Sequence, residues 1–219
     1  MKKLTLILIA LALVPACNYQ QFPSDVKTAT PAPVKTDPRN VAGFTKVHIA
    51  NNLTAEITVG GDFSVTIEGD EKLVDSIATN VEEDLLTVAL KEKHNRETKV
   101  GVKITMPDLK ALEVSGGSTA AVTGVKGDAF RVQANGSTRI RISGEVKSLE
   151  AHAYGASVLD ADGLKAETVD VEAMGAASAG VSASKTLKVK AAGMAKVVYT
   201  GDPKIEKDTK NSSTVVKKQ

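Results

Sequence analysis

The sequence is poor in aromatic residues and in cysteine, and it contains no tryptophan. Phenylalanine and tyrosine make up 3% of the 219 residues, so a core must be built from valine, leucine, isoleucine and alanine. The only cysteine is Cys17, which excludes an internal disulfide and leaves a structural zinc site without a basis. The three histidines, His48, His94 and His152, show no metal-ligand spacing. We therefore expect neither a metal nor another cofactor.

An excess of charge and a long apolar run are also lacking. The chain has 28 basic and 26 acidic residues, and loss of Lys2 and Lys3 with a cleaved leader would leave 26 of each. A near-neutral chain offers no strongly basic field, so we do not expect a nucleic-acid partner. The longest apolar run, residues 4–14, is too short to span a bilayer as a mature helix.

This run is typical of an export signal, because Lys2 and Lys3 provide a positive start before it. Residues 14–17, Val-Pro-Ala-Cys, resemble a bacterial lipobox, and this resemblance implies acylation of Cys17. We expect residues 1–17 to be a lipoprotein signal peptide and the lipid to anchor the chain in a membrane. Asn18 favours the outer membrane by resemblance to enteric lipoprotein sorting. The alternative is an ordinary secretory signal with an incidental cysteine.

Residues 18–40 are rich in proline and have no apolar period. They contain four of the seven prolines in the chain, among threonine, lysine, glutamine and aspartate. This composition predicts a flexible tether between the anchor and a folded domain.

Five glycines recur at nearly constant spacing between Lys110 and Ile205. The spacings are 20, 19, 20 and 18 residues, for Gly116, Gly136, Gly155, Gly175 and Gly193. Apolar residues alternate with polar ones on both sides of each glycine, which indicates two short half-buried strands per unit. A second corner is expected about eight residues after each glycine, for example at Gly124 and Gly144. A unit of about 19 residues cannot bury its apolar face alone, so we expect the units to stack. The pattern predicts an all-β fold, a β-solenoid of the parallel β-helix type with corner glycines.

The predicted domain spans residues 41–217, with regular coils over 110–205. The part before Pro107 also reads as β but is less regular, with a first coil over 44–59 and one or two helical turns over 70–77. After the last regular coil, Asn211 takes the glycine position of a polar partial coil, which we interpret as a cap. The hydroxyl groups two residues after the glycines, on Ser118, Thr138 and Ser157, are expected to satisfy backbone groups at the corner.

Stacked coils place outward side chains in ladders. On one wall the repeat aligns Arg131 with Glu150, Asp170 with Lys188 and Glu172 with Lys190, which predicts exposed ion pairs. The aligned Tyr154 and Met174 are the only apolar patch that the sequence indicates there.

The other wall carries a group of four charged residues: Arg139, Arg141, Asp160 and Asp162. This group resembles the outer wall of parallel β-helix polysaccharide lyases and hydrolases, with Asp160 and Asp162 as acid and base or Ca²⁺ ligands and Arg141 as a substrate clamp. Alternation alone, however, turns two carboxylates two residues apart to the same side, and the next coil supplies no third ligand. We therefore expect no catalytic residue.

The region from residue 39 to about residue 217 resembles the head GIN domain family of bacterial envelope adhesins. The residues that carry the resemblance are 41–47 (Val-Ala-Gly-Phe-Thr-Lys-Val), 109–117 with the first corner, the repeated glycines, and 199–203 (Tyr-Thr-Gly-Asp-Pro). The resemblance implies a β-helix-like fold and a lipid-anchored or secreted protein, and none of these motifs is catalytic.

Three functions remain open. The first is a lipid-anchored outer-membrane protein that binds a glycan, matrix or protein ligand. The second is a polysaccharide-active enzyme on the same scaffold. The third is a structural or envelope-stress lipoprotein. The sequence leaves the oligomeric state open.

Overall fold

A computed structural model describes residues 34–91 and 100–218. The predicted signal peptide with Cys17, tether residues 18–33 and the charged segment that includes His94 lie outside the described residues. Within the described ranges, none of the helices has the length and apolar character needed to cross a membrane.

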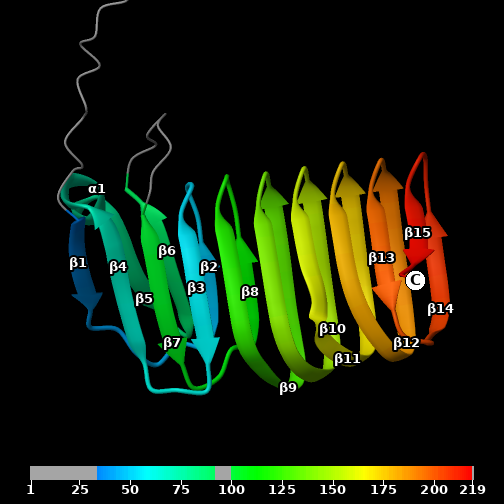
Figure 1. Cartoon of the computed structure of the whole chain (residues 1–219), viewed down its shortest axis with the longest axis horizontal. Coiled ribbons are helices and arrows are strands. Elements are labelled where there is room, and N and C mark those ends of the chain that lie inside the picture. Colours follow the sequence, from blue (N-terminus) through cyan, green and yellow to red (C-terminus); the bar gives the residue numbers. More distant parts are fainter. Residues whose placement is uncertain (1–33, 92–99, 219) are drawn as a thin grey trace, which may run out of the picture. The chain divides into compact units, whose positions relative to one another are not determined.

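Four long strands form the regular coils, and each pairs in parallel with the next. They are β9 (Thr119–Gly136), β10 (Arg139–Gly155), β11 (Val158–Gly175) and β12 (Ser178–Gly193). Each strand curves round so that its two halves lie in opposite walls (Figure 1). The first half of β9 pairs with β3 (Thr54–Val59), and its second half pairs with β8 (Ala111–Val114). The predicted β-solenoid is confirmed.

We call the two walls A and B. Wall A contains the second halves of β9–β12, with β8, β2 (Lys46–Ile49), β6 (Leu85–Leu90), β5 (Ile77–Glu82) and β14 (Lys204–Thr209). Wall B contains the first halves, with β3, β7 (Gly101–Met106), β4 (Ser64–Asp70), β1 (Val34–Arg39), β13 (Lys196–Thr200) and β15 (Thr214–Lys217).

The five repeated glycines form a column at the corner where each coil passes from wall A to wall B. Their φ angles lie between 77° and 86°, a region that favours glycine. The column is also crowded, because a Cβ at Gly155 would lie 3.0 Å from the carbonyl oxygen of Gly136.

The second corner differs from the prediction of two separate short strands per coil. There, β9–β12 run through without interruption, and the pairing shifts register at bulges such as the one between Ile142 and Gly144. A bulge bends a strand while the ladder continues on both sides, so one strand serves both walls.

The core lies between the walls and is thin. Every second residue along a strand is buried, and residues at the same position of successive coils stack in a column. One such buried column contains Phe130, Leu149, Val169 and Leu187. Alanine fills the column two places before the corner glycines, with Ala134, Ala153, Ala173 and Ala191 at 0–3% exposure, because little room remains there.

The predicted tether is wrong at its C-terminal end. Residues 34–39 form strand β1, which pairs antiparallel with β4. Its ends are fixed by an ion pair between Lys35 and Asp75 and by Arg39, which donates a hydrogen bond to the carbonyl oxygen of Val74. Pro38 is tolerated because β1 is an edge strand.

The two ends of the stack are irregular in different ways. The predicted helical turns are present as α1 (Glu71–Asp75), which is capped by the Asp70 side chain and buries Val74. At the other end every residue of β14 is exposed, and Asn211 has a φ of 60° at the glycine position. The last coil is therefore polar, as the sequence predicts.

Candidate functional site

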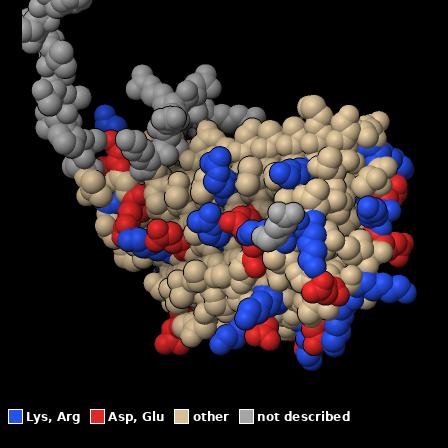
Figure 2. Space-filling model, turned by 45° about the vertical axis from the view of Figure 1, so that its right-hand side comes forward, with Lys and Arg blue, Asp and Glu red and all other residues tan. Residues whose placement is uncertain are grey.

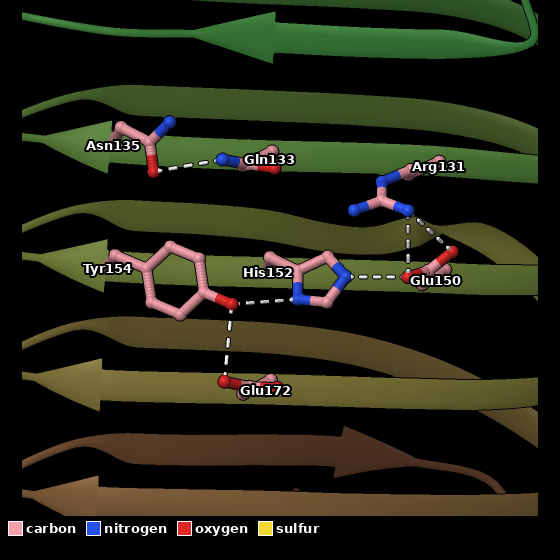
Figure 3. Close-up of polar contacts among 7 residues, drawn as sticks. All are labelled: Arg131, Gln133, Asn135, Glu150, His152, Tyr154 and Glu172. Atoms are coloured by element: carbon pink, nitrogen blue, oxygen red, sulfur yellow. Dashed lines mark hydrogen bonds and ion pairs between the residues drawn. The ribbon is translucent and has the colours of Figure 1, made fainter.

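A hydrogen-bonded network occupies the outer face of wall A, centred on His152 (Figure 3). Nε2 of His152 lies 2.8 Å from Oε1 of Glu150, and Nδ1 lies 3.0 Å from the hydroxyl of Tyr154. Glu150, His152 and Tyr154 alternate along β10, so all three project from the same face of one strand.

The network continues onto the neighbouring coils. Arg131 on β9 forms an ion pair with Glu150 at 3.1 Å, and the Tyr154 hydroxyl donates a hydrogen bond to Glu172 on β11 at 3.2 Å (Figure 3). Beside it, Asn135 accepts from Gln133 and donates to Glu113 on β8. The polar face therefore spans four successive strands, from β8 to β11.

The centre of the network is less accessible than its edges. The His152 side chain is 15% exposed, against 46% for Glu150 and 54% for Arg131. Burial and the nearby charge of Glu172 raise the pKa of Tyr154 above its usual value of 10.0. The rings of His152 and Tyr154 stack with their centroids 5.9 Å apart, which fixes the tyrosine against the wall.

An open hollow of about 450 Å³ lies next to the network, at the second corner. Arg131 and Glu150 line both the network and the hollow, and the hollow also has charges of both signs from Lys126 and Asp128. A ligand on wall A would meet hydrogen-bond donors, carboxylates and one aromatic ring within a few strands. In the described part of the chain, no group of three histidine, cysteine, aspartate or glutamate side chains could hold a metal ion.

The charged group predicted on wall B is only partly assembled. Nε of Arg141 lies 2.9 Å from Oδ2 of Asp160, as the aligned register predicts. Asp162 instead pairs with Lys218, whose Nζ lies 2.6 Å from Oδ2 of Asp162. Arg139 is in register with Val158 and has no ion-pair partner among the described residues. Of the four residues, only Arg141 and Asp160 therefore contact each other.

The corner hydroxyls meet the expectation only in the first coil. Ser118 accepts a hydrogen bond from the backbone N–H of Leu53 at 3.2 Å. Thr138 and Ser157 are at most 2% exposed, and among the described residues their hydroxyl groups have no partner. The prediction is wrong for these two residues, because the parallel ladder of the coils already pairs the nearby backbone groups.

Of the three predicted ladder pairs, the structure shows the ion pair between Arg131 and Glu150. Asp170 is in register with Lys188 and Glu172 with Lys190, as expected, but neither pair is within ion-pair distance. The repeat pattern alone does not connect His152 with Tyr154. The signal that could have linked them is their spacing of two residues, with Glu150 two residues earlier on the same strand.

Fold and walls together define a parallel β-solenoid with one long, polar, exposed face on each side. The family described as "Putative auto-transporter adhesin, head GIN domain" matches residues 43–203, and the chain belongs to this family. No curated protein matches the chain.

Solved structures share the fold. A structure described as a "putative adhesin" from Bacteroides fragilis is 18% identical with a TM-score of 0.69, over 84% of this chain and 96% of that chain. Two further structures, also described as putative adhesins, are similar. The one from Parabacteroides distasonis is 19% identical with a TM-score of 0.59, over 85% of this chain and 97% of that chain. The one from Parabacteroides merdae is 17% identical with a TM-score of 0.56, over 85% of this chain and 96% of that chain.

Proposed function

We propose that the chain is a lipid-anchored protein of the bacterial outer membrane that faces outward and binds a glycan through wall A, without catalysis. Membership of an adhesin family supports a surface role, and the lipobox-like residues before Cys17 support the anchor. The tether of residues 18–33 then holds the solenoid away from the lipid surface.

The observation that carries the proposal is the network around His152. Its side chains are held by one another and by flat, parallel strands, so their positions are set before a ligand arrives. A preorganised surface loses little conformational entropy on binding. The same side chains would rearrange at an entropic cost if they were isolated on a mobile loop.

A glycan suits this surface because of the mixture of groups on it. Sugar hydroxyl groups both donate and accept hydrogen bonds, and the network offers donors on Arg131 and Asn135 and acceptors on Glu150 and Glu172. Tyr154 adds an apolar ring face, on which the C–H groups of a pyranose ring can pack.

The polysaccharide-enzyme alternative has less support from wall B. Acid–base cleavage of a glycosidic bond needs two carboxyl groups that face the substrate. Arg141 contacts Asp160 and Lys218 contacts Asp162, so each carboxylate has a cation as its partner.

The test is glycan-array binding by cells that carry the full chain, beside cells that lack it. Tyr154→Ala removes the ring and the hydrogen bond to Glu172, so we expect binding to fall about tenfold or more. Arg141→Ala is the matched control, because it removes an exposed contact on wall B and should leave binding unchanged. Binding that is lost with Arg141→Ala and kept with Tyr154→Ala would contradict the proposal, as would the absence of any bound glycan.

A further inference from the structure

The N-terminal end of the solenoid is acidic. Residues 34–39 and 60–84, which form β1, β4, α1, β5 and their turns, contain nine acidic and three basic residues. Several of these carboxylates are neutralised locally, for example Asp75 by Lys35 and Glu68 by Lys103. Five have no ion-pair partner among the described residues: Asp62, Asp70, Glu71, Glu82 and Glu83.

The C-terminal end is basic to the same extent. Residues 185–218 contain nine lysines and three acidic residues. Figure 2, in which this end is turned forward, shows lysine side chains gathered over it. Lys185, Lys217 and Lys218 pair with carboxylates, and Lys210 lies 3.8 Å from Asp208. Five lysines have no ion-pair partner in the described part of the chain: Lys188, Lys190, Lys196, Lys204 and Lys207.

Both ends also expose strand edges. In wall B the outermost strands are β1 and β15, and in wall A they are β5 and β14; each pairs with a single described strand. The open edges of a sheet carry unpaired backbone groups that can accept another strand. Strand β1 is antiparallel to β4, and β4 is antiparallel to β7, so β1 runs in the same direction as β7. The pairings from β7 through to β15 are all parallel, so β1 also runs in the same direction as β15. An acidic end placed on a basic end would therefore continue wall B as a parallel sheet.

The charges on wall A are also aligned between the two ends. Leu85 on β6 is in register, strand by strand, with Glu206 on β14. Glu83 lies two residues before Leu85, and Lys204 lies two residues before Glu206. Stacking one copy on another brings Glu83 and Lys204 to about the same level along the wall.

We propose that the chain associates head to tail with further copies of itself, the acidic end of one solenoid against the basic end of the next. Like ends repel each other by charge, and unlike ends attract, so the polar last coil does not end the stack as a cap would but selects the direction of stacking. A single weak contact per molecule becomes effective when the copies are anchored side by side on a membrane, because anchoring raises their local concentration. The proposal stands independently of the glycan hypothesis, since it uses the ends of the solenoid and not the outer face of wall A.

The first experiment is sedimentation velocity of the full chain in detergent. We expect association at low ionic strength that weakens about tenfold or more when NaCl is raised from about 50 to about 500 mM, because the attraction between exposed charges is screened. The double variants K204E/K207E and E82K/E83K should each be monomeric. A mixture of the two should associate again, because the reversed basic end of one variant fits the reversed acidic end of the other.

The matched control is K126E/K165E, which reverses two exposed lysines of the middle coils and should associate like the unaltered chain. Disulfide trapping gives a second readout of the direction. Glu83→Cys and Lys204→Cys chains, each with Cys17 kept for the anchor, should crosslink to each other and not to themselves.

Four results would overturn the proposal. They are a chain that is monomeric at every salt concentration, association that does not respond to salt, a mixture that stays monomeric, and equal loss of association in the control. Capture of a soluble polyanion by the basic end of a monomeric chain would also overturn it, because that end would then serve a different partner.

Discussion

The hydroxyl of Tyr154 on β10 donates a hydrogen bond of 3.2 Å to Oε1 of Glu172 on β11, which ties two neighbouring coils across the face of wall A. The contact lies in the middle of the network that we assign to ligand binding, and burial and the Glu172 charge there favour the neutral phenol.

Tyr154 should ionise at higher pH than an ordinary tyrosine. An ultraviolet titration of the chain, compared with Tyr154→Phe, should place its pKa above 10.0, and Glu172→Gln should lower that pKa by removing the nearby charge. Because the pKa is raised on folding, the associated stability is present below about pH 10 and is lost as the pH rises through the raised value. A titration of Tyr154 at or below pH 10 would contradict the contact.

Removal of two corner hydroxyl groups, on Ser157 and Ser118, should change the stability of the fold in opposite directions. Ser157 is buried with no partner among the described residues, so Ser157→Ala should stabilise the fold by about 1 kcal/mol. Ser118→Ala leaves the buried N–H of Leu53 without its acceptor and should cost about 1–2 kcal/mol. Alanine already occupies this column at Ala177 and Ala195, which shows that the coils accept it. Urea denaturation measures both changes, and equal shifts in the midpoint would contradict the assignment.

The bend in β10 should depend on Gly144. A Cβ at this position would lie 2.0 Å from the carbonyl oxygen of Val125, and the φ angle of 149° is strained for other residues. Gly144→Ala should therefore cost about 2–4 kcal/mol of unfolding free energy. Gly101 is the control, because a Cβ there would lie 3.8 Å from the Glu68 carbonyl oxygen, and Gly101→Ala should change stability by less than about 1 kcal/mol. Equal denaturation midpoints for the two variants would show that the bend does not need glycine.

Acylation of Cys17 is a separate prediction. Cells fed radiolabelled palmitate should label the chain, and Cys17→Ser should lose the label and the membrane association together. Because Cys17 is the only cysteine, no other thiol can carry a thioether-linked lipid. Label that persists in Cys17→Ser would contradict the anchor.

Much of the fold could be predicted from the sequence, because the solenoid repeats its physical constraints. Each corner needs the same backbone conformation, so a glycine returns at the same position of each coil, for example Gly155 and Gly175. The alternation of apolar and polar residues beside these glycines marks the buried face. Strand β1 was missed because its six residues are short and polar and contain Pro38. What fixes it is an edge of β4 that is distant in sequence.

Less of the candidate site could be predicted. The ion pair between Arg141 and Asp160 follows from their register in adjacent coils. The contact between Asp162 and Lys218 does not, because it joins residues 56 positions apart through the reach of a long side chain. The network around His152 depends in the same way on side-chain rotamers, which an alternating pattern leaves undetermined.

The claim that the chain acts at the outer surface is tested most directly by protease shaving of intact cells, with a known periplasmic protein as the internal control. We expect the solenoid to be degraded while the control survives. Protection of the solenoid until the outer membrane is permeabilised would contradict that claim and place the protein in the periplasm.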